Sequence, residues 1–185
     1  MKTLNRCLAG FLCTAALAAG QVQADHGPTT VGGASMLPER SIVDNAVNSA
    51  DHETLVAAVQ AAGLAETLAG EGPFTVFAPV DAAFAALPDG TVQGLLEPQN
   101  RDRLRGLLTY HVVPGRLTRE ELHEAVMERG EAASFATVQG ERLTVMPNGN
   151  NLMLVDGQGR RANLTLVDVA QANGVIHVID RVMMP

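Results

Sequence analysis

Cysteine is nearly absent from this chain of 185 residues, since the sequence has only Cys7 and Cys13, both near its start. The first two dozen residues combine a positive start with an apolar run that is shorter than the roughly 20 residues needed to span a bilayer. They end in Val22-Gln23-Ala24, a small-x-small pattern. These features predict a secretory signal over residues 1–24. The exported chain then lacks cysteine altogether, which excludes disulfides and thiolate chemistry.

Aromatic and basic residues are also scarce. The chain has no tryptophan, one tyrosine and five phenylalanines, so it offers little aromatic surface on which bases or sugars could stack. Its 13 lysines and arginines stand against 20 aspartates and glutamates, and loss of Lys2 and Arg6 with the signal leaves 11 against 20, a net charge of −9. Binding to nucleic acids or anionic membranes depends on basic patches. We therefore expect no nucleic-acid partner and no membrane insertion after the signal is removed.

Motifs with catalytic or metal-binding spacing are missing as well. The sequence contains no G-x-S-x-G elbow, no P-loop and no H-E-x-x-H. Residues 157–162, GQGRRA, match a dinucleotide fingerprint only superficially, because a strand and not a helix is expected to follow them. His177 alternates with Val175 and Ile179, a pattern more typical of a hydrogen-bonded core histidine than of a metal ligand. We expect no enzymatic activity, no cofactor and no metal site.

The rest of the chain divides into an arm and one domain. Residues 25–40 are rich in glycine, proline and threonine without apolar periodicity, which predicts a flexible, exposed N-terminal arm. Residues 41–185 have the length and the patterning of a single domain.

Helices are expected mainly in the first part of this domain. Residues 41–44, SIVD, and residues 118–121, TREE, have the form of capping boxes, so a helix should begin at each. Asp51 and Asp81 are placed to cap two further helices, the first of which should end at Gly63.

Strands are expected mainly in the second part. Two early strands are predicted at residues 74–78 and 109–113. Residues 147–150, PNGN, and 156–159, DGQG, are strong hairpin turns, because asparagine and glycine tolerate the positive φ that such turns require. The fold class is therefore α+β, with helices first and an antiparallel meander after them. The strands expected in the meander are 136–138, 143–146, 152–155, 163–169 and 175–182.

Three segments resemble the sequence boxes of the fasciclin domain family. Residues 75–84, TVFAPVDAAF, look like its first box, residues 110–115, YHVVPG, are similar to its tyrosine–histidine motif, and residues 173–185, NGVIHVIDRVMMP, are similar to its second box. The likeness covers residues 41–185, with Val80 standing where the family more often has threonine or asparagine. The box residues expected to serve the structure are Thr75, Phe77, Pro79, Asp81, Phe84, Asn173, Gly174, His177 and Asp180.

The resemblance implies a fold and a function. The fold would be a compact wedge in which N-terminal helices pack around a small antiparallel β-sandwich. The protein would be a secreted or periplasmic, non-enzymatic interaction module for cell adhesion, with a cell-surface or matrix protein or polysaccharide as its partner. In some animal relatives the tyrosine–histidine segment is linked to receptor binding, which carries over here to Tyr110, His111, Val112 and Val113. The alternative is that this segment serves the structure and does not contact a partner. Because side chains alternate along a strand, we expect only one of Tyr110 and His111 to be buried.

Other functions are also considered. A periplasmic carrier could hold a small apolar ligand between helices and sheet, with Met146, Met153, Met183 and Met184 lining the pocket. A hydrolase that uses scattered carboxylates is a third reading. A lone module would gain from multivalency, which makes a weak homodimer a reasonable expectation.

Overall fold

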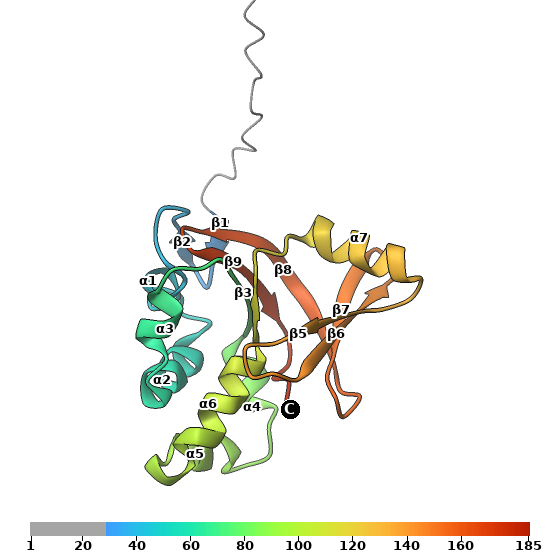
Figure 1. Ribbon diagram of the computed structural model, residues 1–185. Helices are drawn as coiled ribbons and strands as arrows, with labels where there is room; N and C mark the ends of the chain where they lie inside the picture. Colours follow the sequence, from blue (N-terminus) through green and yellow to red (C-terminus); the bar gives the residue numbers. More distant parts are fainter. Residues whose placement is uncertain (1–28) are drawn as a thin grey trace, which may run out of the picture.

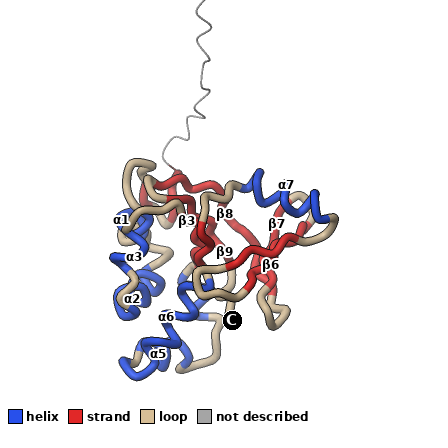
Figure 2. Tube along the Cα trace, viewed as in Figure 1, coloured by secondary structure: helices blue, strands red, loops and turns tan. Residues whose placement is uncertain are grey.

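The computed structural model describes residues 29–185, so the predicted signal and the first four residues of the predicted arm lie outside the described part. A sheet runs through the middle of the molecule (Figure 1). Most helices gather on one side of it, whereas the helix α7 (Arg119–Arg129) lies on the other side, beside the strands β6 (Arg142–Asn148) and β7 (Asn151–Val155) (Figure 2). The elements are β1 (Thr29–Val31), β2 (Ala34–Met36), α1 (Ile42–Ala46), α2 (Glu53–Ala62), α3 (Ala65–Ala69), β3 (Phe74–Pro79), α4 (Asp81–Ala85), α5 (Thr91–Leu96), the 3-10 turn η1 (Pro98–Asn100), α6 (Arg101–Tyr110), β4 (Val112–Pro114), α7 (Arg119–Arg129), β5 (Ala133–Ala136), β6 (Arg142–Asn148), β7 (Asn151–Val155), β8 (Arg161–Gln171) and β9 (Gly174–Ile179).

The main sheet has seven strands in the order β4-β3-β9-β8-β7-β6-β5. Strands β3 and β9 run parallel, with Phe74 opposite Gly174, and the other neighbours are antiparallel. The two ends of the sheet come together, because the backbone N–H of Val138 donates to the carbonyl of Val112 at 2.8 Å. The sheet is therefore large and nearly closed, like a barrel.

This architecture confirms the mixture of helices and strands but not the predicted sandwich. The small antiparallel β-sandwich is wrong. The antiparallel meander predicted after the helices is confirmed, because β5 to β9 pair one after another in antiparallel fashion, and the parallel pair joins the early strand β3 to β9. Strand β8 explains the difference, because its 11 residues pair with β7 at one end and with β9 at the other. Register shifts near Leu164 and Leu166 bend it, as bulges do. One bent strand thus joins what would otherwise be two sheets.

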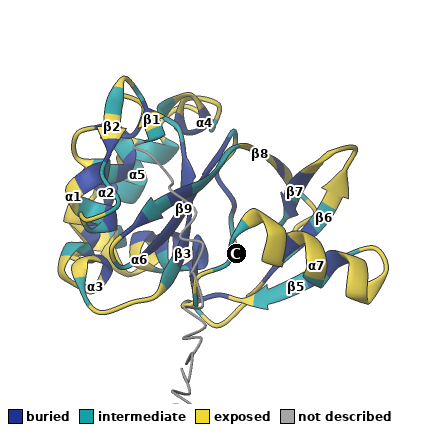
Figure 3. Ribbon diagram, turned by 90° about the horizontal axis from the view of Figure 1, so that it is seen from above, coloured by how far each residue is buried: buried dark blue, intermediate teal, exposed yellow. Residues whose placement is uncertain are grey.

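The centre of the sheet is buried on both faces, as Figure 3 shows for β3 and β9. Along β3, Val76 and Ala78 face a core formed with the helices, whereas Phe77 faces a second core inside the curled sheet. The same alternation occurs in β9, where Val178 belongs to the helical core and Ile179 to the second one. A strand with two apolar faces fits the continuous apolar run that the sequence shows there.

Both predicted capping boxes are confirmed in outline. Ser41 Oγ accepts from the backbone N–H of Asp44 at 3.2 Å, and Thr118 forms a full box with Glu121 at the start of α7. Gly63 ends α2 with a left-handed φ of 67°. The cap predicted from Asp51 is wrong, because His52 precedes α2 and no side chain of its own segment caps it.

The predicted flexible arm is wrong over the residues that the structure describes. Strands β1 and β2 form a hairpin in which Val31 and Met36 are buried. Asn45 fastens the following segment, since its amide Nδ2 donates to the carbonyl of Leu37 at 2.8 Å and its Oδ1 accepts from the Leu37 N–H at 3.1 Å. Strands of three residues are too short to show periodicity in the sequence.

Candidate functional site

The tyrosine–histidine segment lies at a bend between a helix and a strand. The strand predicted at residues 109–113 is wrong in its first part, because α6 continues to Tyr110 and β4 begins only at Val112. His111 joins them with φ −85° and ψ 0°. Alternation does not apply across this bend, so both Tyr110 and His111 are buried, at 0% and 3% exposure. The expectation that one of them would be exposed is therefore wrong.

Tyr110 connects α6 to the hairpin strands. Its hydroxyl donates to the carbonyl of Arg142 at 3.1 Å and accepts from the backbone N–H of Gly157 at 3.3 Å. Burial raises the pKa of the Tyr110 phenol, because a phenolate would lose its hydration. The side chain therefore serves as a neutral link between the helix and two parts of the curled sheet.

His111 connects α6 to the second box. Its Nε2 accepts from the backbone N–H of Met183 at 3.0 Å, so the ring proton lies on Nδ1, which donates to the carbonyl of Leu107 at 2.9 Å. Burial lowers the pKa of His111 to about 4, and the ring is neutral at pH 7. The carbonyl of His111 in turn accepts from Phe77 N at 2.9 Å, which joins this segment to the first box.

The two valines of the segment complete this structural arrangement. Val112 packs in the helical core and Val113 in the core inside the sheet, and both are buried. None of the four side chains Tyr110, His111, Val112 and Val113 reaches the surface. A partner could touch Tyr110 and Val113 only by displacing the core, whereas His111 and Val112 also line the apolar pocket described below.

The first box holds neighbouring elements together. Thr75 Oγ1 donates to the carbonyl of Gly115 at 2.7 Å and accepts from Leu117 N at 2.8 Å, so it ties β3 to the chain after β4. Phe77 stacks on His177 with ring centroids 5.6 Å apart. Pro79 is the last residue of β3, and Phe84 is buried in α4.

Asp81 has a different role from the predicted one. Val80 occupies the position before α4, and Asp81 is the first residue of that helix. Its carboxylate instead accepts from Thr54 N at 2.8 Å and Glu53 N at 3.2 Å, which are the first N–H groups of α2. Asp81 therefore caps a helix 27 residues earlier in the chain, not its own.

The second box begins with a turn that joins three elements. Asn173 Oδ1 accepts from Ile42 N at 3.0 Å, and its Nδ2 donates to the carbonyls of Leu68 and Gly70 at 2.8 and 3.0 Å. A Cβ atom at Gly174 would collide with the carbonyl oxygen of Phe74, so the parallel pairing of β3 and β9 requires glycine there.

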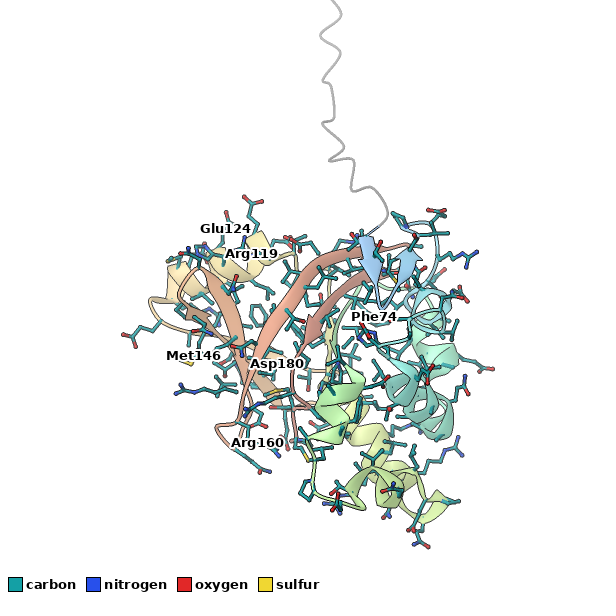
Figure 4. The ribbon with its side chains drawn as sticks, turned by 180° about the vertical axis from the view of Figure 1, so that it is seen from behind. Phe74, Arg119, Glu124, Met146, Arg160 and Asp180 are labelled. Atoms are coloured by element: carbon teal, nitrogen blue, oxygen red, sulfur yellow. The ribbon has the colours of Figure 1, made fainter. Side chains whose placement is uncertain are left out.

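His177 and Asp180 continue this box along β9. His177 Nδ1 accepts from Asp168 N at 3.3 Å and Nε2 donates to the carbonyl of Leu117 at 2.7 Å, and burial lowers the pKa of the ring. Asp180, which follows β9 (Figure 4), accepts from the backbone and side-chain N–H groups of Asn163, both at 2.8 Å. Both residues are thus occupied within the fold.

Two aspartates with structural roles are missed by sequence reasoning. Asp168 adopts a positive φ of 58° and accepts from Arg119 N at 2.7 Å, at the first turn of α7. Asp156, which is almost fully buried, pairs with Arg160 at 2.8 Å and accepts from Met184 N at 3.2 Å. The Asp-Gly pattern at Asp156 predicts the hairpin turn, but the long-range bond from Met184 N to Asp156 has no local signal in the sequence.

The described residues offer no obvious catalytic centre. Within residues 29–185, no three histidine, cysteine or acidic side chains lie close enough to hold a metal ion. His111 and His177 use both ring nitrogens in hydrogen bonds to the main chain. His52 Nδ1 lies 2.9 Å from Ser49 Oγ, and its buried Nε2 has no partner among the described residues.

The four methionines proposed for a ligand carrier do not line one cavity. Met183 is fully buried in the core of the sheet. Met146 and Met153 face each other across β6 and β7 and are half-buried, with Met146 on the outside of the sheet (Figure 4). Met184 lies apart from them, in a cleft beside α5. The methionine-lined pocket expected for a carrier is therefore wrong.

A different, apolar pocket lies between α1, α2, α3 and β3. Its volume is ≈ 70 Å³. The floor contains Phe77, Leu108, His111 and Val112, all of which are buried. The remaining lining residues come from the helices and β3 and are Ile42, Val43, Ala46, Leu55, Val56, Val59, Gln60, Ala65, Leu68 and Val76. Apart from His111, Gln60 is the one lining side chain with polar atoms.

The family of this chain follows from comparison with known proteins. The family model described as the fasciclin domain matches residues 50–185. The chain belongs to the fasciclin domain family. Fasciclin-domain proteins are generally non-enzymatic adhesion or surface proteins. The match includes all three boxes, whose residues hold the fold together in this structure.

Individual known proteins are similar to large parts of this chain. Protein sll1483 of Synechocystis sp. is 42% identical over 191 residues, which cover 100% of this chain and 99% of the relative. Cell surface glycolipoprotein MPB83 of Mycobacterium bovis is 30% identical over 167 residues, covering 88% of this chain and 68% of the relative. The solved FAS1 domain pair from the insect cell adhesion molecule fasciclin I is similar with a TM-score of 0.47 and 23% identity, over 69% of this chain and 40% of that one.

Proposed function

We propose that this protein is an exported adhesion module, which binds a protein or polysaccharide of a cell surface or matrix through its outer surface. The observation that carries the proposal is family membership over most of the chain together with the burial of most residues in the family's boxes. Since these boxes are occupied in holding helices and sheet together, the exposed residues are left to meet a partner.

Export supports the same function. The first 24 residues predict a secretory signal, and they lie outside the described part of the chain. None of the helices that the structure describes is long and apolar enough to cross a membrane. One relative is named a cell surface glycolipoprotein. A secreted or periplasmic location fits both the predicted signal and that relative.

Binding of the purified chain from residue 25 to residue 185 tests this function. Labelled protein is incubated with intact cells, isolated envelope and matrix, with and without an excess of unlabelled protein. We expect saturable binding that the unlabelled protein competes away. Binding that is absent, or that rises linearly without competition, would contradict the adhesion function.

A protein variant tests whether the partner is contacted by the exposed surface or by the tyrosine–histidine segment. Tyr110→Phe removes only the buried hydroxyl, which bonds to Arg142 and Gly157. If the exposed surface makes the contact, the folded variant binds cells as the wild type does. A folded Tyr110→Phe variant that has lost binding would assign the contact to this segment instead.

A further inference from the structure

The apolar pocket between α1, α2 and α3 has a floor that offers no free polar group. His111 lies at the bottom, but both of its ring nitrogens are already bonded, to Leu107 and Met183. Gln60 is exposed and stands at the rim. Whatever enters the pocket must therefore be apolar, because a buried polar group without a partner costs free energy.

The mouth of the pocket opens on an apolar part of the surface. Val43 and Ala46 of α1, Val56 of α2 and Ala65 of α3 line it and are only half-buried. Val47, directly after Ala46, is 51% exposed, although it is a large apolar residue. Apolar residues that surround a pocket at the surface are typical of a contact site.

The size of the pocket indicates what kind of group it takes. Pockets for whole small-molecule ligands usually measure roughly 300–1,000 Å³. At ≈ 70 Å³ this one is far smaller. It suits a single side chain inserted from a partner, in the way that anchor residues fill pockets at protein interfaces.

The charges around the pocket indicate which kind of residue should flank the inserted side chain in the partner. Residues 41–72, which form α1, α2 and α3, contain five acidic residues and no lysine or arginine. All five are exposed, namely Asp44, Asp51, Glu53, Glu66 and Glu71. Glu53 lies three and seven positions before Val56 and Gln60, so it shares their side of α2. Two arginines border this segment, since the exposed Arg40 precedes α1 by two residues and the guanidinium of Arg101 lies beside Gly63 at the end of α2.

We propose that this face binds a cationic peptide segment of a partner protein, which inserts one apolar side chain into the pocket and places flanking lysines or arginines against the carboxylates. An anionic amphiphile such as a fatty acid would be repelled by the same carboxylates. The inference rests on the proposed adhesion function, because it names the surface and the partner chemistry for that function. Electrostatic attraction would speed the encounter, and the apolar anchor would select the sequence.

The test uses a synthetic peptide with one leucine flanked on each side by two lysines, and the protein from residue 25 to residue 185. Binding is followed by backbone amide NMR shifts. We expect shifts at α1, α2 and α3, and an affinity that falls as salt is raised, because exposed charges are screened. Two control peptides replace the leucine by serine or the lysines by glutamates. Equal binding of either control would overturn the proposal, and so would stronger shifts at this pocket with sodium dodecanoate.

Protein variants complete the test. Ala65→Phe fills the mouth, and we expect it to weaken peptide binding about tenfold, the effect typical of losing an anchor contact. Glu53→Gln combined with Glu66→Gln should weaken it about threefold at low salt. The matched control is Glu124→Gln combined with Glu128→Gln on α7, where Glu124 points away from the molecule (Figure 4), and it should bind as the wild type does. Peptide binding unchanged in folded Ala65→Phe would overturn the assignment of the pocket.

Cell binding distinguishes this inference from the function on which it rests. If wild type and Ala65→Phe bind cells equally and saturably, the adhesion function stands and the pocket is not its contact. If the protein binds the cationic peptide at the pocket but no cell, envelope or matrix, the pocket assignment stands and the adhesion function fails.

Discussion

The carboxylate of Asp81 receives the backbone N–H of Thr54 at 2.8 Å, so a residue of the first box caps a helix that precedes it by one strand and one helix. A second hydrogen bond joins the same two segments, because Asp81 N donates to the carbonyl of Asp51 at 2.8 Å. The first box therefore fixes α2, one wall of the apolar pocket, against the end of β3.

Loss of this cap should destabilise the protein. Asp81→Ala leaves the first N–H groups of α2 without an acceptor, and we expect the free energy of unfolding to fall by about 1–2 kcal/mol, as for other N-cap losses. Urea denaturation followed by circular dichroism measures it. Asp89→Ala, an exposed aspartate in the turn before α5, is the control and should change stability by less than about 0.5 kcal/mol. Equal effects of the two substitutions would contradict the capping role.

Gly174→Ala should be among the most damaging small substitutions. The added Cβ would collide with the carbonyl of Phe74 in the neighbouring parallel strand, so β3 and β9 would have to separate. We expect a loss of about 3 kcal/mol, the upper range for overpacking. Gly106→Ala is the matched control in α6, where a Cβ meets nothing within 4 Å. It should stabilise by roughly 0.5–1 kcal/mol through helix propensity, and a destabilising Gly106→Ala would contradict the geometry described.

Stability should fall as the solution is acidified. The pKa of His111 is about 4 in the folded protein and about 6.5 when unfolded, so the unfolded state binds more protons between these values. The contribution of the neutral ring is complete above pH 6.5 and is lost as the pH falls through 4. The loss is on the order of 3 kcal/mol, and burial of His52 and His177, which lowers their pKa values, acts in the same direction.

Urea denaturation between pH 7 and pH 4 measures this dependence. His111→Gln should be less stable at pH 7 but should lose less stability on acidification. Val113→Ala weakens the neighbouring core without removing a titratable group and should keep the wild-type slope. If His111→Gln keeps the full slope, other groups are responsible for it.

The single tyrosine makes a direct titration feasible. Burial raises the pKa of Tyr110 above the usual value of 10, because the phenolate would be desolvated. The ultraviolet absorbance change of phenol ionisation should therefore have its midpoint above pH 10 in the folded protein, and near 10 in urea. Since the folded pKa is the higher one, stability should also fall as the pH rises through it. A midpoint at or below 10 in the folded protein would argue against a buried hydroxyl.

Local features of this fold were predictable from the sequence. Several features depend on residues within a few positions of each other, namely the capping boxes at Ser41 and Thr118, the helix end at Gly63 and the hairpin turns. The family resemblance likewise depends on short segments. Each of these signals is carried by the residues that form the feature.

Long-range features were not predictable in this way. The parallel pairing of β3 with β9 joins residues about 100 positions apart, and nothing in either strand specifies the partner. Thr109 and Tyr110 suit a strand by propensity but continue α6 in the structure, so the strand predicted at residues 109–113 began too early. Asp81 can cap any exposed helix start, and only the tertiary fold selects α2. The apolar pocket is formed by three helices and a strand, and its lining has no local pattern.

The near closure of the sheet bears on how copies of this protein can meet. An open sheet exposes a row of N–H and C=O groups that can pair with a strand from another chain. Here β4 lies beside the segment after β5, and the bond between Val138 and Val112 uses groups that an open edge would leave free. Assembly by strand addition is thereby disfavoured at this seam, even at high local concentration, and association between copies at the seam would have to proceed through side chains.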